Sequence, residues 1–229
     1  MFAFDPKRTL ALDYPALRTS GILRVKGADV SDFEFLFALF GLLFGLIVAE
    51  LSLKFADAIE LKRERPLGIL TPALAFLLLT DLINFWLYVW GARETLTVSW
   101  RTVFVGVILA MVYFLAASLV FPRTDGRWTN LDELYWTRKR FVAGSILFVN
   151  VVVMGAMLTR ARPAWDDWWF YFYFPSYLLA LAGLTLSRSR RLDFIFLAWA
   201  LANNVAAGSD LLPHSEFGRE IGIVPEAGT

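Results

Sequence analysis

Hydrophobic residues in this sequence come in long runs, and the charged residues gather in the short segments between them. A helix of about 20 mostly apolar residues is long enough to cross a lipid bilayer. The apolar runs predict helices over residues 31–61, 72–90, 102–121, 130–158, 167–186 and 192–207. We therefore predict an all-α fold, a polytopic membrane helix bundle with about six transmembrane helices. The sixth helix is the shortest, and it is either a tilted span or a re-entrant segment.

Start and stop signals flank several of these helices. Ser31 with Glu34 three residues later is a capping box that begins the first helix. The Thr71–Pro72 pair suits the N-cap and first position of the second helix, and Gly91 suits its end. These boundaries predict three parts, which are listed here: an N-terminal polar segment (1–30), the transmembrane bundle (31–208) and a loosely held C-terminal polar tail (209–229).

The first predicted helix carries two contrasting faces. Placing side chains at about 100° per residue puts Gly41, Gly45 and Ala49 on one face. Small residues four apart let another helix approach closely, so we assign these three to helix packing. Glu50 and Lys54 lie on a roughly opposite, charged face. Since neither face suits lipid, we predict that this helix is central, with neighbours on both sides.

Composition narrows the classes of function. The chain is 58% hydrophobic with a formal charge of +1, which favours a lipid bilayer and gives no reason to expect a nucleic-acid partner. It has no cysteine and a single histidine, His214, so it contains no ligand set for haem, an iron–sulfur cluster or zinc. We find no catalytic motif, assign no catalytic or metal-binding residue, and leave the cofactor unknown. An enzyme is the less favoured class.

The basic residues predict an orientation. The connections after the first, third and fifth helices, with the helix ends beside them, hold twelve of the 22 lysines and arginines. Connections rich in Lys and Arg stay in the cytoplasm, so we expect both termini on the opposite side. The N-terminal segment, with five basic residues, argues against this orientation.

Asp81 is the most informative polar residue, because it lies at the middle of the second predicted helix between leucines. Burying a carboxylate there costs about 2.5–3.5 kcal/mol. Asn84 shares its face at i+3, and Asn150 and Asn203 lie inside the fourth and sixth helices. One interpretation is a proton or cation pathway lined by these residues together with Glu50. The other is a hydrogen bond between packed helices, from Asp81 to Asn150, to Ser145 or to a basic side chain, with a charged cluster of Glu50 and Lys54 at the end of the first helix.

Seven aromatic residues follow one another from 168 to 174. Their rings surround the helix, more than an ordinary interfacial belt requires. A flat hydrophobic ligand, such as a lipid, quinone or pigment, would stack on such rings, and headgroup anchoring with ring packing explains them as well. The residues assigned to this ligand site are Trp168, Trp169, Tyr171 and Tyr173.

The first three-quarters of the chain resembles multi-pass bacterial inner-membrane proteins that are themselves uncharacterised. The resemblance rests on SDFEFLFALFGLLFGLIVAE, on FWLYVWG and on TNLDELYWTRKRFV, and it implies location in the inner (plasma) membrane without implying a function. Two hypotheses follow. The chain is a small transporter or channel with a pathway at Asp81, or a non-catalytic accessory subunit of a larger membrane complex. Both predict a homo-oligomer or a complex with other subunits.

Overall fold

The computed structural model describes residues 31–61, 68–93, 96–121, 131–159, 161–208 and 217. These residues form six α-helices and no strand, which confirms the all-α helix bundle. The helices are α1 (Asp32–Leu61), α2 (Leu70–Gly91), α3 (Trp100–Val120), α4 (Leu131–Leu158), α5 (Trp168–Leu186) and α6 (Arg190–Gly208). The predicted N-terminal segment, and the predicted C-terminal tail apart from Phe217, lie outside the described residues.

The helix ends follow the local signals in part. The capping box is confirmed, since the Ser31 amide donates to Glu34 Oε2 at 2.8 Å and the Glu34 amide donates to Ser31 Oγ at 3.2 Å. Gly91 is the last residue of α2, as expected. The expected start of α2 is wrong, because the helix begins at Leu70 and includes the Thr71–Pro72 pair. A proline fits there because the first turn of a helix does not need its amide hydrogen.

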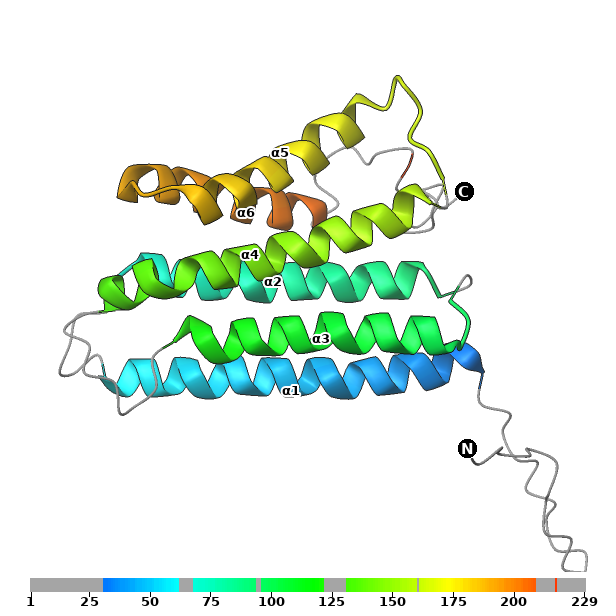
Figure 1. The fold of residues 1–229 in the computed structure, drawn as a ribbon, viewed down its shortest axis with the longest axis horizontal. Coiled ribbons are helices and arrows are strands. Elements are labelled where there is room, and N and C mark those ends of the chain that lie inside the picture. Colours follow the sequence, from blue (N-terminus) through cyan, green and yellow to red (C-terminus); the bar gives the residue numbers. More distant parts are fainter. Residues whose placement is uncertain are drawn as a thin grey trace, which may run out of the picture. The chain divides into compact units, whose positions relative to one another are not determined.

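The contacts between helices join four of them into a closed ring and place the other two outside it. Figure 1 shows these two, α3 and α1, one below the other on one side of the bundle. Within the ring α2 packs on α4 and α6, and α5 also packs on α4 and α6. Helix α3 packs on α2 and α4, and α1 packs on α3. Aromatic rings of α1 also pack on rings of α2, as Phe37 and Phe44 do on Trp86. The prediction that the first helix is central is therefore wrong: among the described helices, α1 is the outermost. Its Lys54 and Asp57 form an ion pair with each other at 3.7 Å.

The contacts of the glycines explain why α1 is peripheral. A side chain added at Gly45 would meet nothing within 4 Å, and one at Gly41 would make only an ordinary contact with Trp86. Close packing occurs elsewhere, where the ring of Phe40 lies against Gly106 and the ring of Phe196 lies against Gly183. Rings packed against glycines thus join α1 to α3 and α5 to α6, whereas α1 has open space at Gly45.

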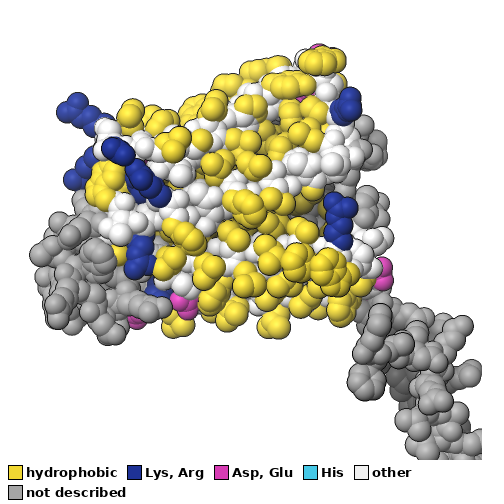
Figure 2. Space-filling model, in the orientation of Figure 1, with side chains coloured by type: hydrophobic (Ala, Val, Ile, Leu, Met, Phe, Trp, Pro, Cys, Tyr) yellow, Lys and Arg dark blue, Asp and Glu magenta, His cyan; other side chains and the backbone are white. Residues whose placement is uncertain are grey.

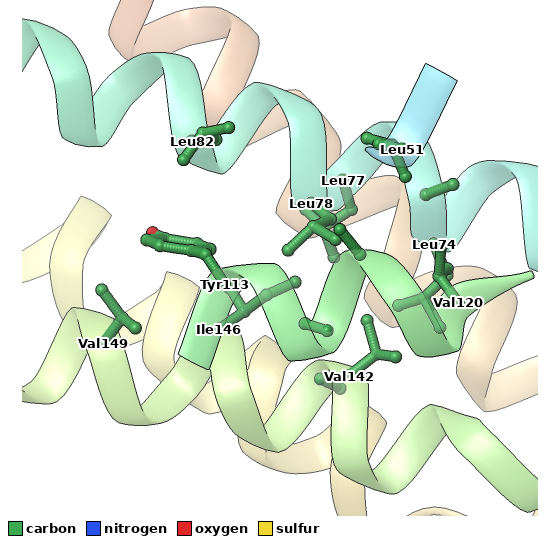
Figure 3. Close-up of a cluster of buried hydrophobic side chains, with 14 of the residues drawn as sticks. Leu51, Leu74, Leu77, Leu78, Leu82, Tyr113, Val120, Val142, Ile146 and Val149 are labelled. Carbon is green, nitrogen blue, oxygen red and sulfur yellow. The ribbon is translucent and has the colours of Figure 1, made fainter. Parts of the chain in front are cut away.

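Leucines of α2 form the centre of the core together with residues of α3 and α4 (Figure 3). Leu77, Leu78 and Ile146 are fully buried. The outward flanks of the helices are also hydrophobic, and Figure 2 shows such side chains spread over the visible flank. A bundle that is apolar both inside and outside is typical of a protein in lipid, where the hydrocarbon covers the outer surface.

Five helices, α1 to α5, are long and apolar enough to cross a membrane. The protein is therefore a membrane protein by the length and composition of its helices. Helix α6 has 19 residues but is not among those five. The reason is its composition, because Arg190, Arg191 and Asp193 lie in its first turn and Asn203 and Asn204 lie near its end. Among the described residues, five helices instead of about six are therefore apolar enough to span, and α6 is the more polar helix of the ring.

Hydrogen bonds to Asp167 hold the start of α5. Asp167 caps it, because one carboxylate oxygen accepts from the amide of Phe170 at 3.1 Å. The other oxygen accepts from the amide of Phe217 at 2.9 Å. The Phe217 ring is 1% exposed and packs edge-on against Phe170, with 4.9 Å between ring centroids. We expected a loosely held tail, and this residue of it is anchored.

The two ends of the bundle differ in charge. The end at which α2, α4 and α6 begin, called here the basic end, carries Lys54, Arg138, Lys139, Arg140, Arg188, Arg190 and Arg191. The opposite end carries Arg93, Arg101 and Arg162 among the described residues. Figure 2 shows the larger group of dark blue side chains at the basic end, on the left.

Candidate functional site

Asp81 lies halfway along α2 and is 3% exposed. Its carboxylate accepts three hydrogen bonds from three other helices. Tyr113 of α3 donates to Oδ2 at 2.7 Å, and Tyr177 of α5 donates to Oδ1 at 2.7 Å. The side-chain amide of Asn150 on α4 donates to Oδ1 at 2.9 Å. Four helices therefore meet at one carboxylate.

A second set of hydrogen bonds brings α6 into the same site. The Asn204 amide group donates to the hydroxyl oxygens of Tyr177 and Thr80, each at 3.2 Å. Asn84 in turn donates to the side-chain oxygen of Asn204 at 3.0 Å and to its backbone oxygen at 3.2 Å. Asn84 is half-buried and lies closer than Asp81 to the end of α2. A chain of hydrogen bonds thus runs from Asp81 through Tyr177 and Asn204 to Asn84.

The direction of these hydrogen bonds bears on the charge that the site stabilises. Every partner of Asp81 is a neutral donor, and the chain from Asn84 also donates towards it. An ionised carboxylate can only accept hydrogen bonds, and bonds in this direction stabilise its charge. Among the described residues, no lysine or arginine forms an ion pair with Asp81. Three of about four acceptor positions are occupied, and one on Oδ2 remains.

A buried ion pair forms a second polar cluster nearer the basic end. Lys139 of α4 and Asp193 of α6 are 2.6 Å apart, and their side chains are 1% and 0% exposed. Asp193 also accepts from Tyr135 at 3.0 Å and from the Ser187 hydroxyl. Lys139 also donates to the backbone oxygen of Ser187 at 2.8 Å and lies over the Trp136 ring. The cluster therefore joins α4 to α6 and to the connection before it.

The two clusters occupy the same faces of their helices. On α4, Asn150 follows Lys139 by eleven residues, and on α6, Asn204 follows Asp193 by eleven. Eleven residues are close to three full turns and about 16 Å along a helix. The buried residues in between are apolar apart from Ser145 of α4, and the apolar ones include Val142, Ile146, Leu181, Leu184, Leu197 and Ala200. An apolar layer therefore separates the Asp81 cluster from the basic end.

The structure brings together part of the predicted pathway. Asp81, Asn84 and Asn150 lie in one network. Asn203 does not join it, because its amide donates to the backbone oxygen of Trp199 in its own helix. Adjacent helical residues point about 100° apart, so only Asn204 of the pair reaches Tyr177. Glu50 is on α1, outside the ring, and no hydrogen bond among the described residues connects it to this network.

The predicted aromatic ligand residues lie in the first two turns of α5, at the end opposite the basic end. Trp168 and Tyr171 are exposed, and the rings of Trp169 and Tyr173 stack on each other with centroids 5.5 Å apart. Within the run 168–174 only Phe170 is buried. The rings therefore cover the outside of the bundle and pack on one another along the helix.

Sequence reasoning missed the tyrosines and the ion pair. Tyr113 and Tyr177 look like ordinary aromatic residues in apolar spans, and nothing local indicates that both point at Asp81. A signal did exist for Lys139, which falls on the same helical face as the buried residues Tyr135, Val142 and Ile146. A single charge on an apolar face is the pattern expected of a buried, paired group.

Comparison of the chain with protein families, with characterised proteins and with solved structures finds no match. No group of three or more acidic or histidine side chains that could hold a metal ion occurs among the described residues. The arrangement at Asp81 itself therefore carries the functional argument.

Proposed function

We propose that this protein moves protons across a membrane, and that Asp81 is the group that takes up and releases them. The observation that carries the proposal is a buried carboxylate held by three neutral donors, without a cationic partner among the described residues. Ionisable residues inside membrane helices are rare and are usually part of ion or proton pathways. A proton fits better than a metal cation, because it can bind the remaining acceptor position of Asp81 without displacing any of the three hydrogen-bond donors.

The chain of hydrogen bonds from Asp81 to Asn84 supports entry of protons from one end of the bundle. The Tyr177 hydroxyl accepts from Asn204 and donates to Asp81, as a proton relay requires. The chain continues to half-buried Asn84, towards the end opposite the basic end. On the other side, the apolar layer and the Lys139–Asp193 pair separate Asp81 from the basic end. This arrangement is that of a transporter closed at its basic end.

Proton flux into proteoliposomes tests the proposal. Purified protein is reconstituted with a trapped pH-sensitive dye, and a potassium diffusion potential drives proton entry. The wild type should acidify the interior faster than empty liposomes, and Asp81→Asn should remove that excess while keeping the thermal unfolding profile. Asp57→Asn is the matched control, since it removes a carboxylate on α1 outside the ring, and it should keep full flux. Wild-type liposomes no faster than empty ones, or full flux through Asp81→Asn, would contradict the proposal.

A second candidate function is that of an accessory subunit in a larger membrane complex or homo-oligomer. It is favoured by the open face of α1 around Gly45 and Ala49, which are both exposed, and by the exposed rings of α5. The chain lacks cysteine, so a single Ala49→Cys variant reports on self-association without background. A disulfide-linked dimer in membranes supports association between copies. Purification in mild detergent identifies other subunits, and membrane fractionation tests the inner-membrane location implied by the resemblance.

A further inference from the structure

A groove opens at the basic end of the bundle, between the start of α2 and the first two turns of α6. Its volume is about 540 Å³. The residues lining it are Ile69, Leu70, Arg190, Arg191, Phe194 and Ile195. None of these six is acidic, and the groove is separate from the Asp81 network and from the buried ion pair.

The lining is ordered by depth along the helix. Arg190 and Arg191 are the first two residues of α6, and Phe194 and Ile195 follow one turn further from the basic end. One helical turn is about 5.4 Å. The arginines and both of these apolar side chains are exposed, as is Ile69 across the groove. The groove is therefore positively charged at its outer end and apolar towards the middle of the bundle.

A phospholipid has the same order of chemistry, with a phosphate at the surface and acyl chains deeper in the bilayer. Arginine binds phosphate through paired hydrogen bonds, and basic pockets between membrane helices bind anionic headgroups. A groove of this size is within the usual range for small-ligand sites. An acidic peptide would match the arginines but would not require an apolar wall that runs towards the membrane interior.

We propose that this groove binds one anionic phospholipid, with its phosphate on Arg190 and Arg191 and an acyl chain along Phe194, Ile195 and Ile69. The site does not depend on proton transport, because it shares no residue with the Asp81 network. The bound lipid bridges α2 and α6, so it should stabilise the folded bundle against heat.

Thermal unfolding of the full chain in mild detergent tests the site. Phosphatidylglycerol, phosphatidylcholine with the same acyl chains, and inorganic phosphate are each titrated. We expect saturable stabilisation by phosphatidylglycerol alone. In Arg190→Gln/Arg191→Gln the concentration needed for half of the effect should rise by roughly tenfold or more. The control Arg138→Gln/Arg140→Gln removes the same charge from α4 at the same end and should respond like the wild type.

Other outcomes would overturn the site. Equal stabilisation by both lipids would mean ordinary solvation by lipid, and stabilisation by phosphate alone would mean a simple anion site. An equal loss of response in the α4 control would mean general surface attraction. A saturable response to an added acidic peptide but not to phosphatidylglycerol would assign the groove to a protein. If the double variant does not fold, Arg191→Gln and Ile195→Asn are tested separately, and an unchanged response in both contradicts the proposal.

Discussion

Three hydrogen bonds hold a carboxylate in a place that strongly disfavours it. Burying a charged residue at the centre of a membrane helix costs about 2.5–3.5 kcal/mol. A hydrogen bond to a charged group contributes about 1.5–3 kcal/mol. Two tyrosine hydroxyls and one amide therefore offset the cost of burying Asp81.

Substituting the two tyrosines in turn distinguishes effects on stability from effects on the proposed proton transfer. Tyr113→Phe and Tyr177→Phe each remove one donor from Asp81, so each should lower the unfolding free energy by about 1–3 kcal/mol. Only Tyr177 also accepts from Asn204, so only its loss interrupts the chain to Asn84. Thermal unfolding and dye-based flux should show both variants destabilised, with flux reduced mainly in Tyr177→Phe. A larger flux loss in Tyr113→Phe would mean that protons reach Asp81 from the side of α3.

The asparagine pair shows the limit of sequence reasoning at this scale. Asp81, Asn84 and Asn150 are identified by the position of a polar group within an apolar span. Predicting that Asn204 and not Asn203 joins the network requires the rotation of α6 about its own axis. That rotation is fixed by the helices packed against α6. Asn204→Ala removes the side-chain hydrogen bonds to Asn84, Thr80 and Tyr177, and it should destabilise the protein by about 1–3 kcal/mol. Asn203→Ala is the matched control and should have a smaller effect, as measured by thermal unfolding.

At the scale of elements, small residues are informative only when their neighbours are known. The glycines of α1 form the more regular pattern in sequence, yet Gly106 and Gly183 are the ones against which rings are packed. The sequence does not contain this information, since a glycine four residues from another looks the same on an open face and in a contact. Helix boundaries, by contrast, depend on residues close in sequence, and they were predicted to within two residues or so for most helices.

Alanine substitutions test this assignment. A methyl group at Gly106 would lie 2.2 Å from the tip of the Phe40 ring, so the buried ring or the helix must move. Overpacking of this kind costs about 1–3 kcal/mol. Gly45→Ala meets nothing within 4 Å and should be neutral or slightly stabilising, because alanine favours helix. Thermal unfolding midpoints of the two variants provide the comparison. Equal midpoints would mean that the α1–α3 contact adapts freely.

The contributions of Lys139 and Asp193 to stability are expected to depend on each other. Removing one partner leaves a buried charge uncompensated, which costs about 3–5 kcal/mol. Lys139→Met and Asp193→Leu should therefore each be strongly destabilised, whereas the double variant should recover much of the loss. A double-mutant cycle on thermal unfolding measures this coupling. Additive losses would show that the two side chains act separately, through Tyr135 and Ser187.

At the scale of the whole molecule, the fold class follows from the sequence but the arrangement does not. Apolar runs of the right length predict membrane helices whatever their neighbours are. Which helices form the ring depends on contacts far apart along the chain, such as Asn84 with Asn204, separated by 120 residues. This is why α1, whose glycine face and charged face predict neighbours on both sides, was expected at the centre and lies at the edge.

The uneven charge of the two ends leads to a last prediction, on orientation. The basic end should face the cytoplasm, since connections rich in lysine and arginine are retained there. Single cysteines at the exposed positions Arg140 and Arg188 should be protected from a membrane-impermeant thiol reagent in intact cells and should react after lysis. A cysteine at exposed Arg162, at the opposite end, should react in intact cells. The reverse pattern would contradict the orientation.

This orientation also fixes the direction in which the proposed site is reached. Asn84 lies on the side of Asp81 away from the basic end, so protons would enter the polar chain from the non-cytoplasmic side. The apolar layer and the Lys139–Asp193 pair would then form the barrier to the cytoplasm. In oriented vesicles, acid on the non-cytoplasmic side should speed modification of buried Asp81 by a hydrophobic carbodiimide, which reacts with the protonated carboxyl group. If Tyr177 carries the proton inward, acid should speed the reaction less in Tyr177→Phe than in the wild type. Equal dependence in both proteins would mean that protons reach Asp81 by another route.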